Sequence, residues 1–195
     1  MFERLAVVVL FIMLVKSIAG PVAHGASIFN LLILVSEGLV VLLVMLRRPA
    51  IELSTKPVDW LLAFGASAVP TLLRSGGVHP LSPPAVAGAI MLVGIIAQVA
   101  CKLALLRSFG VAPANRGLVI AGPYRFVRHP IYASYIISQA GFLLLNPTAW
   151  NVGVLAVNLM LQILRIGAEE RVLAHDPGHA AFCKAVPYRL VPLLF

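Results

Sequence analysis

The stretch PAVAGAIMLVGIIAQVACKLALL, residues 84–106, is the longest apolar run of the chain and decides its fold class. A helix needs about 20 mostly apolar residues to cross the hydrocarbon core of a bilayer, and this run provides them. Further apolar runs lie on both sides of it, at Leu5–Ala23, Ile28–Leu46, Val58–Leu73, Pro130–Leu145 and Thr148–Ile166. The sequence therefore predicts an all-α fold, that of a polytopic integral membrane helical protein.

Two of the six runs, Val58–Leu73 and Pro130–Leu145, are short for a membrane span. The second covers only about 24 Å at 1.5 Å per residue, against a hydrocarbon core of roughly 30 Å. The runs Pro130–Leu145 and Thr148–Ile166 either both cross the membrane or form a helical hairpin around Asn146–Pro147 that does not fully cross. We expect about five to six transmembrane helices in a single membrane domain, residues 1–195.

The composition excludes a water-soluble globule and a disordered chain. Hydrophobic residues make up 61% of the chain, against roughly 45–50% in soluble domains, and charged residues make up only 11%. The two cysteines, Cys101 and Cys183, do not suggest a disulfide framework. The five histidines are scattered, so the sequence predicts no metal site.

The positive charge of the chain is explained by membrane topology. There are 15 Lys and Arg against 7 Asp and Glu, a formal net charge of +8. If the six runs alternate in direction, most of the basic residues fall on one side, and Lys and Arg are retained on the cytoplasmic side. Both termini and the Arg107–Arg128 linker are therefore predicted to be cytoplasmic. We expect membrane lipids as neighbours and no nucleic-acid partner.

Ionisable residues inside apolar runs are costly and are functional candidates by default. Lys16 lies near enough to the end of its run for its side chain to reach the interface. Glu37 lies in the middle of its run, so it either pairs with a basic residue of a neighbouring helix or is protonated. Gln98 and Lys102 are four residues apart, which predicts a polar stripe pointing toward the linker. Snorkelling of the side chain explains Lys102 alone but not the pair.

The linker ends in GLVIAGPYRFVRHPIY, residues 117–132, which favours a turn followed by a helix. Gly122-Pro123 is a turn signal, and Pro130 suits the first turn of a helix, where its missing N–H costs nothing. The free N–H groups of that helix, together with Arg125 and Arg128, would form an anion site at the membrane surface. The same arginines would equally suit lipid phosphates.

A second polar segment, RIGAEERVL at residues 165–173, follows the last apolar run directly. Arg165 and Glu169 are four residues apart and can pair on a helix, whereas Glu170 points about 100° away. One interpretation is an ordinary surface ion pair. The other is a site for a cationic ligand, because Glu169 and Glu170 are two of only seven acidic residues in the chain.

Both segments resemble the isoprenylcysteine carboxyl methyltransferase family and its relatives, the phospholipid N-methyltransferases. These are integral membrane enzymes that use S-adenosyl-L-methionine. The resemblance runs from Gln98 to the C-terminus and rests on Leu118-Val119, GPYR at 122–125, Arg128-His129-Pro130 with Tyr132, Glu169-Glu170 with Leu173, and Val186-Pro187 to Pro192. It implies a methyltransferase-like cofactor-binding region at residues 84–195, after N-terminal helices at residues 1–83 that carry no assignable motif.

The resemblance also implies residue roles. The expected cofactor-binding residues are Gly122, Tyr124, His129, Pro130, Tyr132 and Glu170. The expected catalytic residues are Arg128, Glu169 and Glu170, and Arg128 and Arg165 are the expected substrate-binding residues. Two departures from the family pattern stand out: Arg116 occupies a position where members often have His, and tail tyrosines are replaced around His179 and Phe182.

The implied reaction is methyl transfer from S-adenosyl-L-methionine to a lipid-like or prenylated acceptor at the cytoplasmic membrane face. A carboxylate acceptor is already a nucleophile and needs only an arginine such as Arg128 to orient it. An amine acceptor, as in phospholipid N-methylation, would need Glu169 or Glu170 as a base. The remaining alternatives are a reductase using NADPH, since membrane sterol reductases carry an element similar to Arg128-His129-Pro130, and a non-enzymatic membrane protein.

Overall fold

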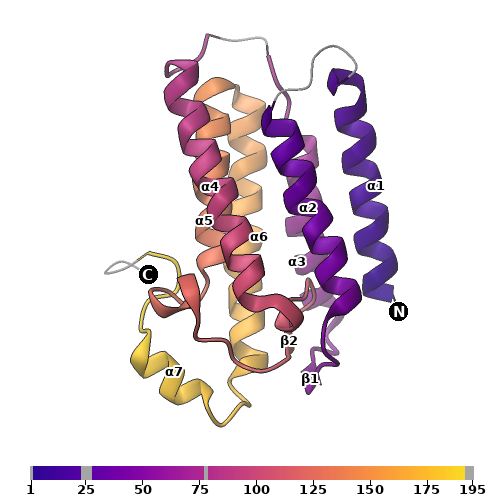
Figure 1. The fold of residues 1–195 in the computed structure, drawn as a ribbon, viewed down its shortest axis with the longest axis vertical. Helices are drawn as coiled ribbons and strands as arrows, with labels where there is room; N and C mark the ends of the chain where they lie inside the picture. The colour runs from indigo at the N-terminus through magenta and orange to yellow at the C-terminus, as the bar shows by residue number, and fades with distance from the viewer. Residues whose placement is uncertain (1, 23–27, 77–78, 192–195) are drawn as a thin grey trace.

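The computed structural model describes residues 2–22, 28–76 and 79–191, and within them the chain is predominantly helical (Figure 1). The longer helices are α1 (Phe2–Val22), α2 (Ile28–Leu46), α3 (Pro57–Ala68), α4 (Pro84–Leu105), α5 (Pro130–Leu145) and α6 (Ala149–Leu173), followed by the short α7 (His179–Ala185). Three 3-10 turns are η1 (Val69–Leu72), η2 (Leu106–Ser108) and η3 (Gly122–Arg125). The predicted runs thus form helices, although Ala23 and Pro192 lie outside the described residues.

The all-α prediction needs one small correction, which is a two-stranded sheet. Strands β1 (Glu52–Leu53) and β2 (Ala114–Asn115) pair antiparallel, with Glu52 opposite Asn115. They join the segment after α2 to the linker after α4. Their role is to fix the linker against the end of the helix bundle.

Two of the described helical segments, residues 84–108 and 149–173, are long and apolar enough to cross a membrane. Residues 31–46 and 130–145 form shorter apolar helices. The total of five to six spans therefore stays a prediction. α5 ends at Leu145 and α6 begins at Ala149, so the turn lies around Asn146–Pro147 as predicted, and both alternatives for how far the two helices cross stay predictions. Thr148 caps α6 by accepting a hydrogen bond from the backbone N–H of Asn151 at 3.1 Å.

Close packing of α4 against α5 depends on two glycines. A Cβ on Gly94 would lie 2.4 Å from the backbone nitrogen of Ser138, and one on Gly141 would lie 2.7 Å from the carbonyl oxygen of Ala87. Small residues at such points let two membrane helices approach closely. In Figure 1, α4, α5 and α6 lie together, α1 and α2 form the other side, and the linker and α7 lie at the lower end.

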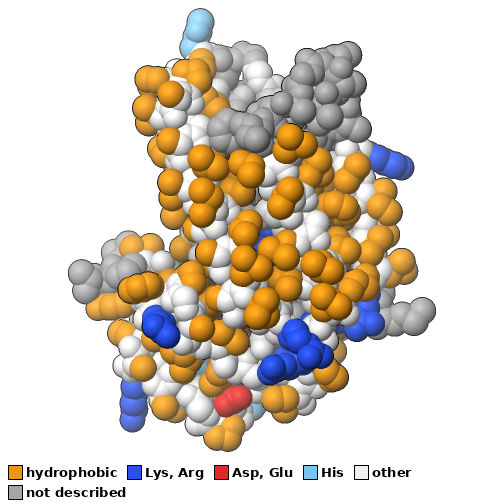
Figure 2. Space-filling model, in the orientation of Figure 1, with side chains coloured by type: hydrophobic (Ala, Val, Ile, Leu, Met, Phe, Trp, Pro, Cys, Tyr) orange, Lys and Arg blue, Asp and Glu red, His pale blue; other side chains and the backbone are white. Residues whose placement is uncertain are grey.

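The surface of the bundle is suited to lipid. Figure 2 shows hydrophobic side chains over most of the visible middle face, whereas Lys and Arg gather mainly toward the lower end, near the linker and α7. Large apolar side chains such as Leu61, Val93 and Met160 are exposed along the helices. A water-soluble monomer rarely exposes so large an apolar area. This arrangement fits a membrane protein with basic residues concentrated at one end.

Inside the bundle, Glu37 of α2 is paired with Lys102 of α4. Lys102 Nζ lies 3.0 Å from Glu37 Oε1 and also donates to the hydroxyl and the carbonyl oxygen of Ser36, at 2.8 and 2.9 Å. This confirms the paired alternative for Glu37. The explanation of Lys102 by snorkelling is wrong, because its side chain is fully buried. The predicted stripe does not point toward the linker either, since Gln98 donates to Ser138 of α5. Lys16 is exposed.

The first helix is fixed to the linker by a buried carboxylate. Glu3, only 2% exposed, accepts hydrogen bonds from the backbone N–H groups of Val111 and Ala112, at 2.8 and 3.1 Å. It also forms ion pairs with Arg47 at 2.5 Å and Arg116 at 3.7 Å. Burying a charge is tolerated when it is paired and hydrogen-bonded in this way. The N-terminal half, which carries no motif, therefore helps to shape the linker.

Candidate active site

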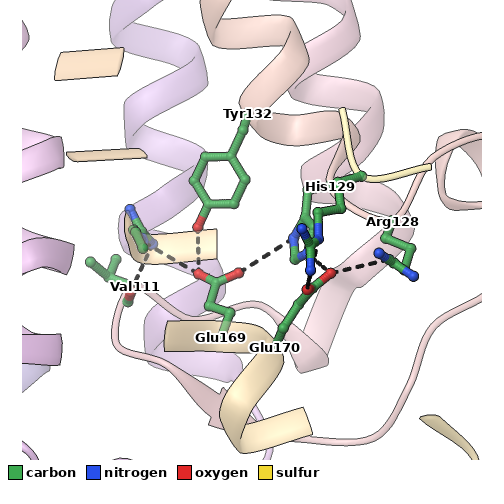
Figure 3. Close-up of polar contacts among 8 residues, drawn as sticks. Val111, Arg128, His129, Tyr132, Glu169 and Glu170 are labelled. Atoms are coloured by element: carbon green, nitrogen blue, oxygen red, sulfur yellow. Dashed lines mark hydrogen bonds and ion pairs between the residues drawn. The ribbon is translucent and has the colours of Figure 1, made fainter. Parts of the chain in front are cut away.

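The start of α5 is held in place by the C-terminal segment. Pro130 occupies the first turn of α5, as predicted, and His129 is the residue before it. The backbone N–H groups of Arg128 and His129 donate to the carbonyl oxygens of Tyr188 and Arg189, at 2.9 and 2.8 Å. These bonds orient the Arg128 and His129 side chains toward α6, from which the two glutamates project (Figure 3).

Glu169 is held by three side chains. The Tyr132 hydroxyl donates to its Oε1, Arg165 Nε lies 3.3 Å from the same oxygen, and His129 Nδ1 lies 3.8 Å from Oε2. The predicted pairing of Arg165 with Glu169 is thus confirmed. It is not a surface pair, because Arg165 is buried and lines a cavity.

Glu170 turns to the other side of α6, as its position predicts, and meets three cationic or polar groups. Its Oε1 lies 3.1 Å from Arg128 Nε and 3.3 Å from His129 Nε2. Its Oε2 accepts from Arg189, with Nε at 2.8 Å and Nη2 at 2.7 Å. His129 therefore lies between the two carboxylates, which brings together most of the predicted site residues (Figure 3).

Arg165 connects this site to the linker. Its Nη2 donates to the carbonyl oxygen of Val111 at 2.7 Å, and its guanidinium lies over the Tyr132 ring, 5.3 Å from the centroid. Because Glu3 accepts from the N–H of the same Val111, one linker residue is bonded from both sides. Arg165 is thereby a fixed part of the wall of the site.

A cavity of about 560 Å³ opens beside these residues, within the range typical of ligand pockets. Its polar end is lined by Arg116, Tyr124, Arg128, His129, Tyr132, Arg165 and Glu169. Leu118, Val119, Leu173 and Phe182 add apolar surface to the lining, and Ile33, Met91, Ile95 and Phe142, which lie farther along their helices from the polar end, line the rest of the cavity. Gly122, Pro130 and Glu170 lie beside the cavity and are not among its lining residues. The cavity suits a ligand with one polar and one apolar end.

Two buried polar atoms at the polar end have neither a hydrogen-bond nor an ion-pair partner among the described residues. They are the Tyr124 hydroxyl and Arg116 Nε. Burial raises the pKa of the Tyr124 phenol well above its usual value, so this group stays a neutral hydroxyl. Burial and the nearby Arg47 lower the pKa of Arg116, although Glu3 opposes them. Unpaired buried groups cost free energy, so both atoms are candidates for ligand contacts.

Arg116, which stands where the family often has His, fits its place because of a neighbouring glycine. A Cβ on Gly110 would lie 2.3 Å from Arg116 Nη1. Gly122 is needed for another reason: its φ of +53° lies in the left-handed region that other residues rarely adopt. It begins η3, which carries Tyr124 into the cavity wall.

The predicted anion site at the start of α5 is only partly formed. Arg128 faces the protein's own carboxylate, Glu170, and Arg125 is exposed outside the cavity. The arrangement is therefore a mixed site of carboxylates and arginines. Sequence reasoning also missed Arg189, Phe182 and the pair of Glu3 and Val111. Arg189 lay in the C-terminal piece of the resemblance, but nothing in the sequence indicated its partner.

Comparison with protein families finds a match over the part of the chain that carries most of these residues. Residues 86–175 match the model of the isoprenylcysteine carboxyl methyltransferase (ICMT) family. The match covers α4, the linker, α5 and α6, and it includes Arg128, His129, Glu169 and Glu170. The match confirms the resemblance drawn from the sequence up to residue 175, so this region is similar to a family of methyltransferases, and the piece from Val186 to Pro192 lies outside the match. No curated protein matches the chain.

Proposed function

We propose, on the premise that residues 86–175 are an ICMT-type region, that this chain transfers a methyl group from S-adenosyl-L-methionine to the carboxylate of a lipid-like or prenylated acceptor at the cytoplasmic membrane face. One observation carries the proposal. Glu169 lines the polar end of a cavity whose other end is mainly apolar, among arginines and a histidine, and Glu170 lies directly behind that histidine. A cationic donor and an amphipathic acceptor both fit such a site.

The residues at the polar end fit the methyl donor. Its ammonium and sulfonium groups suit a carboxylate, its own carboxylate suits an arginine, and its hydroxyls suit unpaired polar atoms. Glu169 and Glu170, Arg116 and the Tyr124 hydroxyl supply these contacts, with His129 and Tyr132 between them. Leu118, Val119 and Phe182 supply apolar surface for the adenine ring. When bound, the donor supplies an activated methyl group, so the protein provides placement and electrostatics.

The acceptor's carboxylate is assigned to Arg128. Its Nε faces Glu170, and its terminal nitrogens are those that would grip a carboxylate in a two-pronged contact. A carboxylate acceptor needs no base, which agrees with the contacts that the two glutamates already make. Both glutamates are already engaged by side chains of the protein, namely Tyr132, Arg165, His129, Arg128 and Arg189, so neither carboxylate is free to serve as a base. This favours carboxyl O-methylation over N-methylation of a phospholipid amine.

The test uses the full chain in lipid nanodiscs with S-adenosyl-L-methionine labelled in the methyl group. A prenylated cysteine should take up label as an ester that is released by base, and the same compound with its carboxyl blocked should take up none. Phosphatidylethanolamine, and NADPH together with an unsaturated sterol as hydride acceptor, are supplied in parallel as substrates for the two alternative activities. Label in a base-stable product of the phospholipid, or oxidation of NADPH with no methyl transfer, would contradict the proposal.

A further inference from the structure

A group of polar side chains, here called the polar belt, lines the cavity between the active site and the far end of the helices. It consists of Ser36, Glu37, Gln98, Ser138, Gln139 and Gln162, all of which line the cavity. Gln139 follows Tyr132 by seven residues on α5, and Gln162 precedes Glu169 by seven residues on α6. Two helical turns correspond to about 10 Å, so the belt lies about that far from the contact between Tyr132 and Glu169.

Most of the belt is held by hydrogen bonds between helices. Gln98 donates to Ser138 at 2.9 Å, which joins α4 to α5. Gln139 and Gln162 both donate to Asn158, and Asn158 donates to the carbonyl oxygen of Ala66, which joins α5, α6 and α3. Polar residues often connect membrane helices in this manner. In a network that served only to connect helices, the buried polar atoms are expected to have partners.

Two groups of the belt do have capacity left for a ligand. Gln162 is only 3% exposed, and its carbonyl oxygen has no hydrogen-bond donor among the residues that the structure describes. Glu37 pairs with Lys102, yet about a third of its side chain stays accessible where it lines the cavity. Both groups offer acceptor oxygens, from α6 and from α2. A hydrocarbon tail would leave the Gln162 oxygen unsatisfied, which is unfavourable.

We infer that the acceptor is an amphipathic lipid with a hydrogen-bond donor, a hydroxyl or an amide N–H, about 10 Å along its chain from the methylated group. Its head lies at Arg128, its donor group meets Gln162 and Glu37, and the rest of its chain fills the apolar end of the cavity. The inference rests on the proposed function for the position of the head. It narrows the substrate class from any prenylated or lipid-like acceptor to one with a polar group within its tail.

The experiment measures binding of two matched probes to the full chain in nanodiscs of a neutral phospholipid. One probe is a prenylated cysteine with an all-hydrocarbon tail, and the other carries one hydroxyl on its second isoprene unit. The hydroxylated probe should bind about tenfold more tightly to the natural chain, as one satisfied buried acceptor implies. Equal affinities, or tighter binding of the hydrocarbon probe, would overturn the inference and leave the belt as a connection between helices.

Variants assign the effect to the belt. Gln162→Met keeps the length of the side chain without its acceptor, so it should remove most of the difference between the probes. Ser134→Ala is the matched control, because Ser134 is buried on α5 but does not line the cavity. If Gln162→Met does not fold, the two probes on the natural chain still decide the question. Methyl transfer is measured separately, so tighter binding of the hydroxylated probe without transfer would support this inference and contradict the proposed function.

Discussion

Replacing Glu170 with glutamine removes one negative charge while keeping the size and an acceptor oxygen of the side chain. In the natural chain this carboxylate meets nitrogens of Arg128, His129 and Arg189 at distances between 2.7 and 3.3 Å. Hydrogen bonds to charged groups are each worth about 1.5–3 kcal/mol, and glutamine retains part of each. Its proposed contact with the cationic methyl donor falls in the same range, so we expect the affinity for S-adenosyl-L-methionine to fall by about 1–3 kcal/mol, or about five- to 150-fold.

Titration calorimetry with S-adenosyl-L-methionine and with S-adenosylhomocysteine measures this change. The second ligand lacks the sulfonium charge, so it separates two positions of Glu170. If the carboxylate faces the sulfonium, Glu170→Gln weakens binding of the first ligand more than that of the second. If it faces the amino group, both ligands lose affinity equally.

The control variant is Glu52→Gln, which changes the same side chain in an exposed pair with His175 at 2.7 Å. It should leave both affinities unchanged. The thermal unfolding of Glu170→Gln is measured alongside, because this carboxylate also holds Arg189 of the C-terminal segment. An unchanged affinity for S-adenosyl-L-methionine in a folded Glu170→Gln protein would refute the reasoning. Glu170 would then bind only side chains of the protein and not the methyl donor.

Three further predictions follow from the cavity, the packing and the topology. Arg128→Lys should lower kcat/KM for acceptors of every tail length, because a point charge cannot replace the guanidinium fork. In the natural protein, shortening the acceptor's tail by three or four carbons should raise KM by about one to two orders of magnitude. Equal turnover of long-tailed and water-soluble acceptors would contradict entry from the bilayer. Gly94→Ala should lower the free energy of unfolding by about 1–3 kcal/mol, since its Cβ meets the backbone of α5. The control Gly153→Ala, whose Cβ has nothing within 4 Å, should be neutral or stabilising. Similar losses of stability in both variants, measured by thermal unfolding, would argue against tight packing of α4 on α5. Cysteines placed at Ile120 and Ala180, in a chain without its two native cysteines, should react with an impermeant reagent from the same, cytoplasmic side, and labelling from opposite sides would disprove the topology.

Local spacing predicted the parts of the site that lie on one element. The distance of four residues placed Arg165 beside Glu169, and the next position turned Glu170 away toward Arg128. Pro130 marked the start of α5, and the Asn146–Pro147 pair marked the turn of the hairpin. In each case the geometry of a single helix, or of one turn, determines the outcome. Family resemblance then joined the two segments into one site.

Contacts between distant parts of the chain could not be predicted in this way. The sequence offered snorkelling as an explanation of Lys102 alone and a stripe toward the linker for its pair with Gln98, but Ser36 and Glu37 of another helix bind Lys102 inside the bundle. Apolar runs in a membrane show which residues are helical but only weakly which faces meet, because lipid and protein interior are both apolar. The cavity and its polar belt depend on these faces, so neither was visible before the helices were assembled.

The bond between Glu3 and Val111 also has a consequence for how the chain is made. The two residues are 108 positions apart, and a ribosome adding about 5–20 residues per second needs several seconds or more to produce the second after the first. During that interval the first helix is already synthesised but lacks its anchor, and Glu3 is left without two of its hydrogen bonds. The bonds that join the first helix to the linker are therefore expected to form only after the second half of the chain has begun to be made, whereas its ion pair with Arg47 can form earlier.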